Sequence, residues 1–248
     1  MNLIKYIGEF LIIAIVALPP FLYLYKYTLD NIDNLFVKIA IYAVYWAGTL
    51  LLSNVMPALA VLFILRDSQR RADRGIEEGS MRFFAGDKWR FSWSSFAKAA
   101  ICGIFIKYAV TVVNYLFILV LQKYGVALKN QEVINEFLKS SVVSSILYFI
   151  MIVFCAPIVE EFVFRYWLYD SVLKRWTGRI ISAVITSILF MAAHYNLQGS
   201  IAFFLIGMIN CYLYEKYGYW AAVANHFMFN FTSAAMLVAV KIFGIPLS

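Results

Sequence analysis

Long runs of apolar residues constrain the fold of this chain more than any other feature of its sequence. About 20 consecutive apolar residues are enough for a helix to cross the hydrocarbon core of a bilayer. Seven such segments lie at approximately residues 7–25, 36–65, 99–121, 142–169, 180–195, 200–214 and 219–243. We therefore expect an all-α, polytopic membrane helix bundle of about seven to eight transmembrane helices.

The composition supports a membrane location. Hydrophobic residues make up 63% of the 248 residues and charged residues 14%, whereas a soluble domain has about 45–50% and about 25%. The net charge of +7 comes from lysines and arginines between the apolar segments. They form no binding face, so we expect a lipid bilayer and no nucleic acid as partner. Cys102, Cys155 and Cys211 show no paired or metal-ligand spacing.

Two loops carry most of the positive charge. Residues 66–98 hold Arg66, Arg70, Arg71, Arg74, Arg82, Lys88, Arg90 and Lys98, and residues 170–179 hold Lys174, Arg175 and Arg179. With seven spans both loops fall on one side of the membrane, and the positive-inside rule makes that side cytoplasmic. The same count places the N-terminus inside and the C-terminus outside.

The chain is expected to have two parts. Residues 1–98 hold the N-terminal transmembrane helices and the basic cytoplasmic loop, and residues 99–248 form a transmembrane core that carries the motifs below. The long second segment is expected to be one span that tilts or extends beyond the bilayer, and Pro57 can kink it. Residues 123–141 fit a short interfacial helix and a solvated loop equally well.

Two adjacent carboxylates, Glu160 and Glu161, lie inside the apolar sequence APIVEEFVFRYWLY. A charge at bilayer depth costs about 2.5–3.5 kcal/mol, so an intramembrane carboxylate suggests a functional site. Arg165 lies one helical turn after Glu161 and is expected to hold it ionised. Glu160 points about 100° away, free to face a cavity and act as a general base, and Pro157 can open the helix beside it. The alternative is a purely structural ion cluster.

The two histidines of the chain also lie in apolar sequence. His194 follows Phe190 by one turn at the end of the fifth segment, and a lone histidine there is more often interfacial than catalytic. His226 and Asn230 share a helix face, and both can donate hydrogen bonds to a developing oxyanion. Asn230 could equally bridge two helices. In a seven-span bundle His194 comes out nearer the opposite membrane surface from Glu160 and His226.

Taken together, Glu-Glu-x-x-x-Arg, Phe-x-x-x-His and His-x-x-x-Asn resemble the motifs of the CPBP family of intramembrane proteases. This family comprises type II CAAX prenyl endopeptidases and enzymes of the bacteriocin-processing and immunity type. The resemblance covers about residues 140–240. In many members glycine stands at the position of Tyr166.

The resemblance implies Glu160 as general base, His194 as the residue that positions the hydrolytic water, and His226 with Asn230 as the oxyanion site. Glu161 and Arg165 would be supporting residues. We expect no cofactor and no metal. Zn²⁺ is the alternative, with Glu160, His194 and His226 as its ligands.

The sequence therefore favours an intramembrane endopeptidase that hydrolyses a membrane-associated peptide or protein, either lipidated or resembling a bacteriocin or pheromone, by a glutamate-activated water. A multi-pass protein of a bacterial plasma membrane is the expected location. The alternatives are a proton-coupled transporter, which would recruit Lys107 and Asn114, and a non-catalytic immunity or scaffold protein.

Overall fold

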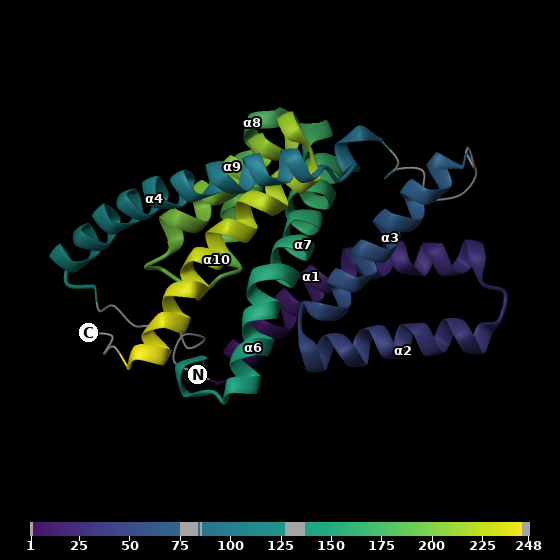
Figure 1. Ribbon diagram of the computed structural model, residues 1–248, viewed down its shortest axis with the longest axis horizontal. Helices are drawn as coiled ribbons and strands as arrows, with labels where there is room; N and C mark the ends of the chain where they lie inside the picture. The colour runs from purple at the N-terminus through teal and green to yellow at the C-terminus, as the bar shows by residue number, and fades with distance from the viewer. Residues whose placement is uncertain (1, 75–83, 85, 127–136, 245–248) are drawn as a thin grey trace.

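The structure is a computed structural model that describes residues 2–74, 84, 86–126 and 137–244, with the side chains of residues 2–11 left out. These residues form helices joined by short turns and contain no strand, which confirms the all-α membrane bundle (Figure 1). Most of the amphipathic segment expected at 123–141 lies outside the described residues.

The first part of the chain contains α1 (Asn2–Asn31), α2 (Leu35–Leu52), α3 (Val55–Asp73), the short helix η2 (Asp87–Trp89) and α4 (Trp93–Lys123). A continuous helical stretch follows, made of α6 (Val142–Ile150), η3 (Met151–Cys155), α7 (Ala156–Glu160), η4 (Glu161–Leu173) and α8 (Lys174–Ala192). The chain then forms α9 (Ser200–Tyr217) and α10 (Tyr219–Phe243). Among the described residues, five helical stretches are long and apolar enough to cross a membrane: Ile12–Asn31, Leu35–Leu52, Trp93–Lys123, Val142–Ala192 and Tyr219–Phe243.

The apolar segment 36–65 is not the single span that its hydropathy predicts. It breaks at Ser53, whose φ is 49°, into the antiparallel helices α2 and α3. Gly48 lets them approach closely, since a Cβ there would come 2.4 Å from Cγ of Met56. Pro57 produces no kink, because it lies in the first turn of α3, where the missing N–H is not needed.

The segments 142–169 and 180–195 belong to one stretch of 51 residues. Inside it, η3 and η4 are π-helical, a form in which each N–H bonds to the carbonyl five residues back. Gly178, with φ 75° and ψ 178°, redirects the chain within α8. Only about 20 Å of helix then follows, which is shorter than a bilayer core of about 30 Å. The part of α8 after Gly178 is therefore too short to cross a bilayer by itself.

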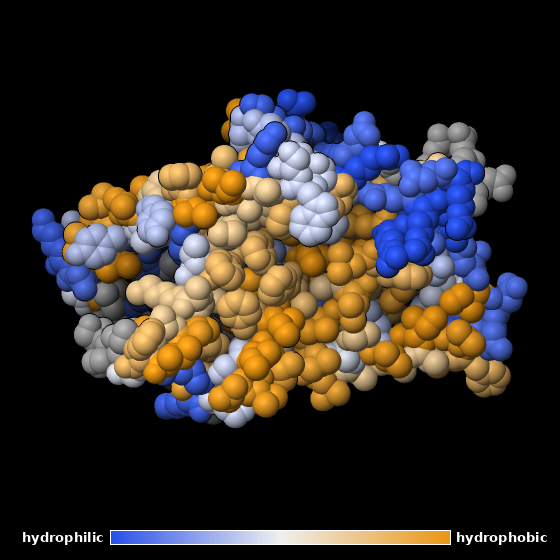
Figure 2. Space-filling model, in the orientation of Figure 1, coloured by the Kyte–Doolittle hydropathy of each residue, from blue (hydrophilic) through white to orange (hydrophobic). Residues whose placement is uncertain are grey.

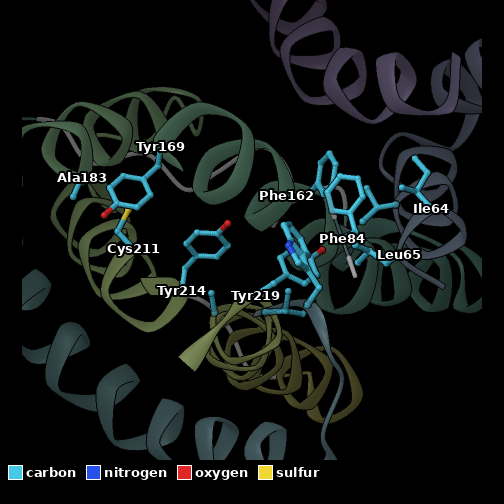
Figure 3. Packing of buried hydrophobic residues seen from close by; sticks show 13 residues of the cluster. Ile64, Leu65, Phe84, Phe162, Tyr169, Ala183, Cys211, Tyr214 and Tyr219 are labelled. Atoms are coloured by element: carbon cyan, nitrogen blue, oxygen red, sulfur yellow. The ribbon is translucent and has the colours of Figure 1, made fainter. Parts of the chain in front are cut away.

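The helices pack in a bundle in which α10 lies against α4, α9 and η3, and α8 lies against α9 and η4. One core cluster gathers side chains of α3, η2, η4, α8, α9 and α10 near one end of the bundle (Figure 3). Its larger buried members include Ile64, Phe84, Trp89, Phe162, Tyr169, Tyr214 and Tyr219. The outer surface is broadly apolar, and hydrophilic side chains gather at its upper edge over the ends of α3 and α8 (Figure 2).

The two basic loops meet at this end of the bundle, which we call the basic end. Lys88 Nζ lies 3.0 Å from the carboxylate of Asp170, and Lys174 pairs with both Asp170 and Glu215. Trp220 donates from its indole N–H to the backbone carbonyl of Trp89 at 2.9 Å. The expectation that both loops share one side therefore agrees with the structure.

The N-terminal helix runs in the opposite direction to the expected one. Arg71 of α3 donates to Asn31 Oδ1 at 2.5 Å, so α1 ends at the basic end. At the other end of the bundle Lys241 of α10 donates to the carbonyl of Ser140 at 2.6 Å. Figure 1 shows the start of α1 and the end of α10 on this second side. The N-terminal prediction was wrong because the second apolar segment is two helices, which adds one crossing before the basic loop.

Candidate active site

The two adjacent glutamates lie where α7 gives way to η4, with opposite environments. Glu161 is fully buried, and its Oε2 lies 3.0 Å from Nε of Arg165. Oε1 of Glu161 is 2.8 Å from Nδ2 of Asn210 and 2.6 Å from Nδ1 of His226. The ion pair with Arg165 that the four-residue spacing predicts is present, and two partners from distant helices add to it.

Glu160 has no such set of partners. Its Oε2 is buried and accepts no hydrogen bond from the described residues. The ring of His226 lies beside it, with Nε2 3.8 Å from that oxygen. The side chain keeps 15% of its surface exposed. Glu160 is therefore less constrained than Glu161, which is fully buried and held by three partners.

His226 lies between the two carboxylates and contacts each through a different ring nitrogen. An ionised carboxylate paired with arginine can only accept, so Nδ1 of His226 carries the hydrogen of the bond to Glu161. This assignment leaves Nε2 facing Glu160. The ring nitrogen that is not bonded to Glu161 is therefore the one beside Glu160.

His194 joins the site through Phe190. Its Nδ1 lies 2.7 Å from the Phe190 carbonyl, and its ring stacks on Phe203 with centroids 3.9 Å apart. The Phe190 ring lies 4.6 Å from the His194 ring and 5.7 Å from the His226 ring. The two histidines therefore flank one aromatic ring, in place of the opposite membrane positions expected from a full-length fifth span.

Phe190 also contacts Arg165, whose Cζ lies 4.4 Å from the ring centroid. A guanidinium over an aromatic face gains electrostatic stabilisation in a desolvated place. Phe190 is therefore the common neighbour of the arginine and of both histidines. The sequence predicted only that Phe190 and His194 share a helix face. It did not predict the contacts of Phe190 with Arg165 and His226.

Asn230 makes a hydrogen bond that Pro157 explains. In η3 the carbonyl of Met151 accepts from the N–H of Ala156, five residues on. The same pattern would pair the carbonyl of Ile152 with residue 157, but proline has no N–H. Nδ2 of Asn230 donates to that carbonyl at 2.9 Å. One amide hydrogen of Asn230 is thus used in joining two helices, and the second is available for the site.

Sequence reasoning missed the two buried amides behind Glu161. Nδ2 of Asn225 lies 2.7 Å from Oδ1 of Asn210, which in turn donates to Glu161. Both asparagines have 0% exposed surface. An asparagine inside the apolar run of α9 was a usable signal, because such residues usually bond between helices.

Lys107 and Asn114, which a transport mechanism would recruit, are bonded to other helices. Lys107 donates to Ser233 Oγ at 2.7 Å and lies over the ring of Phe229. Asn114 donates to the Gln198 carbonyl and accepts from the backbone N–H of Ala202. Both contacts tie α4 to the motif-bearing helices.

The residues considered as zinc ligands do not fit a zinc site. Within the described part of the chain no three histidine, cysteine, aspartate or glutamate side chains are arranged to hold one ion.

The fold and the site define a class, a multi-pass helical membrane protein with a buried Glu-Glu-Arg-His cluster. Residues 142–232 match the family model described as type II CAAX prenyl endopeptidase Rce1-like. This match confirms the resemblance to the CPBP membrane proteases that the motifs show in the sequence. No curated protein and no solved structure matches the chain.

Proposed function

We propose that the chain is an intramembrane endopeptidase in which Glu160 takes a proton from a water molecule as that water attacks a peptide carbonyl. The observation that carries the proposal is the contrast between the glutamates. Glu161 has three partners, whereas Oε2 of Glu160 has no hydrogen-bond partner among the described residues and faces a histidine nitrogen. A desolvated carboxylate without a fixed partner is suited to proton transfer.

Charge balance supports the same roles. Glu160, Glu161 and Arg165 together carry one net negative charge, and a doubly protonated His226 brings the cluster to zero. A buried cluster is far cheaper to desolvate when its charges cancel. When Glu160 accepts the proton of water, the charge moves to the carbonyl oxygen of the substrate, and the total stays at zero.

The oxyanion then needs donors. The Nε2 hydrogen of protonated His226 and the second amide hydrogen of Asn230 are the groups that we propose for it. His194 would hold the attacking water, because only its Nδ1 is occupied by the Phe190 carbonyl. The neighbouring aromatic rings of Phe190 and Phe203 would exclude other water from the site.

The substrate that we propose is a membrane-associated peptide or protein, either lipidated or resembling a bacteriocin or pheromone. The site supports this class because it lies among apolar helices. A peptide substrate would therefore have to approach it from within or beside the bilayer. We propose a bacterial plasma membrane as its location, because its loops are short.

Cleavage of a peptide library by the purified chain in liposomes tests the proposal. Glu160→Gln keeps the shape and removes the base, so we expect activity to fall by about 10²- to 10⁴-fold. His194→Ala and His226→Ala should also lower activity. Asp87→Asn, at a fully exposed acid, is the control and should cleave normally. Unchanged cleavage by a folded Glu160→Gln would refute the proposal.

The same preparation separates the alternatives. Stoichiometric zinc whose removal abolishes activity would favour the zinc mechanism. Proton flux through the liposomes that is lost in Glu160→Gln, without peptide cleavage, would favour a transporter. If the biological function of the chain in cells survives all three site substitutions, the chain is a non-catalytic immunity or scaffold protein.

A further inference from the structure

The two buried asparagines behind Glu161 form a hydrogen-bonded chain with one fixed direction. Glu161 offers only acceptors, so Asn210 must face it with Nδ2 and present Oδ1 to the other side. Asn225 then has to donate with its own Nδ2. The amide orientations therefore follow from the charge of Glu161.

The far end of this chain is held by helix packing. Oδ1 of Asn225 is buried without a hydrogen-bond partner among the described residues. It faces α4 at Gly103, where an added Cβ would lie 3.1 Å from this oxygen. α4 therefore closes over Asn225 and prevents its amide from turning away.

Arg165 shows why Glu161 needs such a support. Its Nε lies 3.0 Å from Oε2 of Glu161, but none of its three nitrogens makes a hydrogen bond to a described residue. Arginine and carboxylate prefer a bidentate arrangement with two parallel hydrogen bonds. A Glu161 free to rotate would turn both oxygens towards the guanidinium and release His226.

We propose that Asn210, supported by Asn225, is a positioning residue that holds Oε1 of Glu161 away from Arg165 and against Nδ1 of His226. The chain thereby fixes His226 in the Nδ1–H tautomer and confines its proton exchange to Nε2, the nitrogen beside Glu160. The effect of this hydrogen-bonded chain on catalysis rests on the proposed function. Its effect on the tautomer of His226 does not depend on that function.

Nitrogen-15 NMR of histidine-labelled protein in detergent micelles measures the tautomer directly. The chain has only two histidines, so His194→Gln identifies the signal of His226. At a pH at which the ring is neutral, the unmodified site should show hydrogen on Nδ1. Asn210→Leu removes the amide at similar volume and should shift the tautomer ratio by about tenfold or more towards Nε2–H, a change of about 1.4 kcal/mol.

Asn225→Ala provides a second variant should Asn210→Leu fail to fold, and it should shift the ratio in the same direction by a smaller factor. Asn114→Leu is the matched control, because Asn114 is also an interhelical amide but lies outside this chain. The ratio should not change there. An unchanged ratio in folded Asn210→Leu and in Asn225→Ala would overturn the proposal.

Peptide cleavage is measured on the same variants. Asn210→Leu should lower kcat about 10- to 100-fold, as loss of a partner behind a metal-bound histidine does, and leave KM nearly unchanged. If the wild-type chain cleaves no peptide while the tautomer shifts as stated, the proposed function fails and the positioning role stands.

Discussion

At the scale of single residues, the burial of the Glu161–Arg165 pair has a measurable consequence. Both side chains have 0% exposed surface, and removal of one partner from such a pair costs about 3–5 kcal/mol. We expect Arg165→Leu to lower the free energy of unfolding by this amount, because Glu161 is left without its cation. Unfolding by denaturant in detergent measures it.

The double variant Glu161→Leu with Arg165→Leu separates the charge from the packing. It removes both charges and should be more stable than Arg165→Leu alone. If the double variant lowers the free energy of unfolding by the sum of the two single-variant losses, the ion-pair explanation is contradicted.

The sequence predicted the local part of this cluster and missed the distant part. The pairing of Glu161 with Arg165 follows from a four-residue spacing, which any helix brings together. Asn210 lies 49 residues from Glu161, and its contact depends on how α9 packs against η4. No spacing rule gives that contact.

At the scale of helices, the contact between α8 and α9 depends on a glycine. A Cβ added at Gly207 would lie 2.8 Å from Cβ and from Oγ of Ser187. We expect Gly207→Ala to destabilise the protein by about 1–3 kcal/mol, since the helices must separate. Gly86→Ala is the control, because nothing lies within 4 Å there. Equal melting temperatures for both variants would contradict this packing.

The turn between α9 and α10 requires glycine for two reasons. Gly218 has φ 85° and ψ 179°, a region essentially confined to glycine. A Cβ there would also lie 2.6 Å from the carbonyl oxygen of Lys88. Gly218→Ala should cost more stability than Gly178→Ala, which has a similar backbone conformation, φ 75° and ψ 178°, but no neighbour within 4 Å. Thermal unfolding of the two variants separates strain from clash, and equal losses would exclude the clash.

Helix type and most helix positions were predictable from hydropathy, but helix breaks were not. The apolar run through Ser53 continues on both sides, so hydropathy alone gives one span where packing makes two. The π-helical segments η3 and η4 have the same composition as an α-helix. Only Pro157 marked the place where the backbone pattern changes.

At the scale of the whole molecule, the direction of α1 predicts where tags will be found. The start of α1 and the end of α10 lie at the end of the bundle opposite the basic end (Figure 1). We expect N-terminal and C-terminal tags to be accessible from the same membrane side, the outer one if the basic end is cytoplasmic. Asp87→Cys should be labelled from the opposite side by an impermeant thiol reagent. Tags on opposite sides would contradict this topology.

Tyr166, at a position where many family members have glycine, connects the N-terminal helices to the matched domain. Its hydroxyl lies 2.6 Å from that of Tyr23 in α1, and its ring packs against Phe84 and Trp89. These three partners precede residue 142, where the family match begins. A chimera that grafts residues 142–232 onto a foreign N-terminal half would therefore deprive the Tyr166 hydroxyl of its Tyr23 partner and leave a hollow in its aromatic packing. Transplanting this domain means transplanting its aromatic partners as one set.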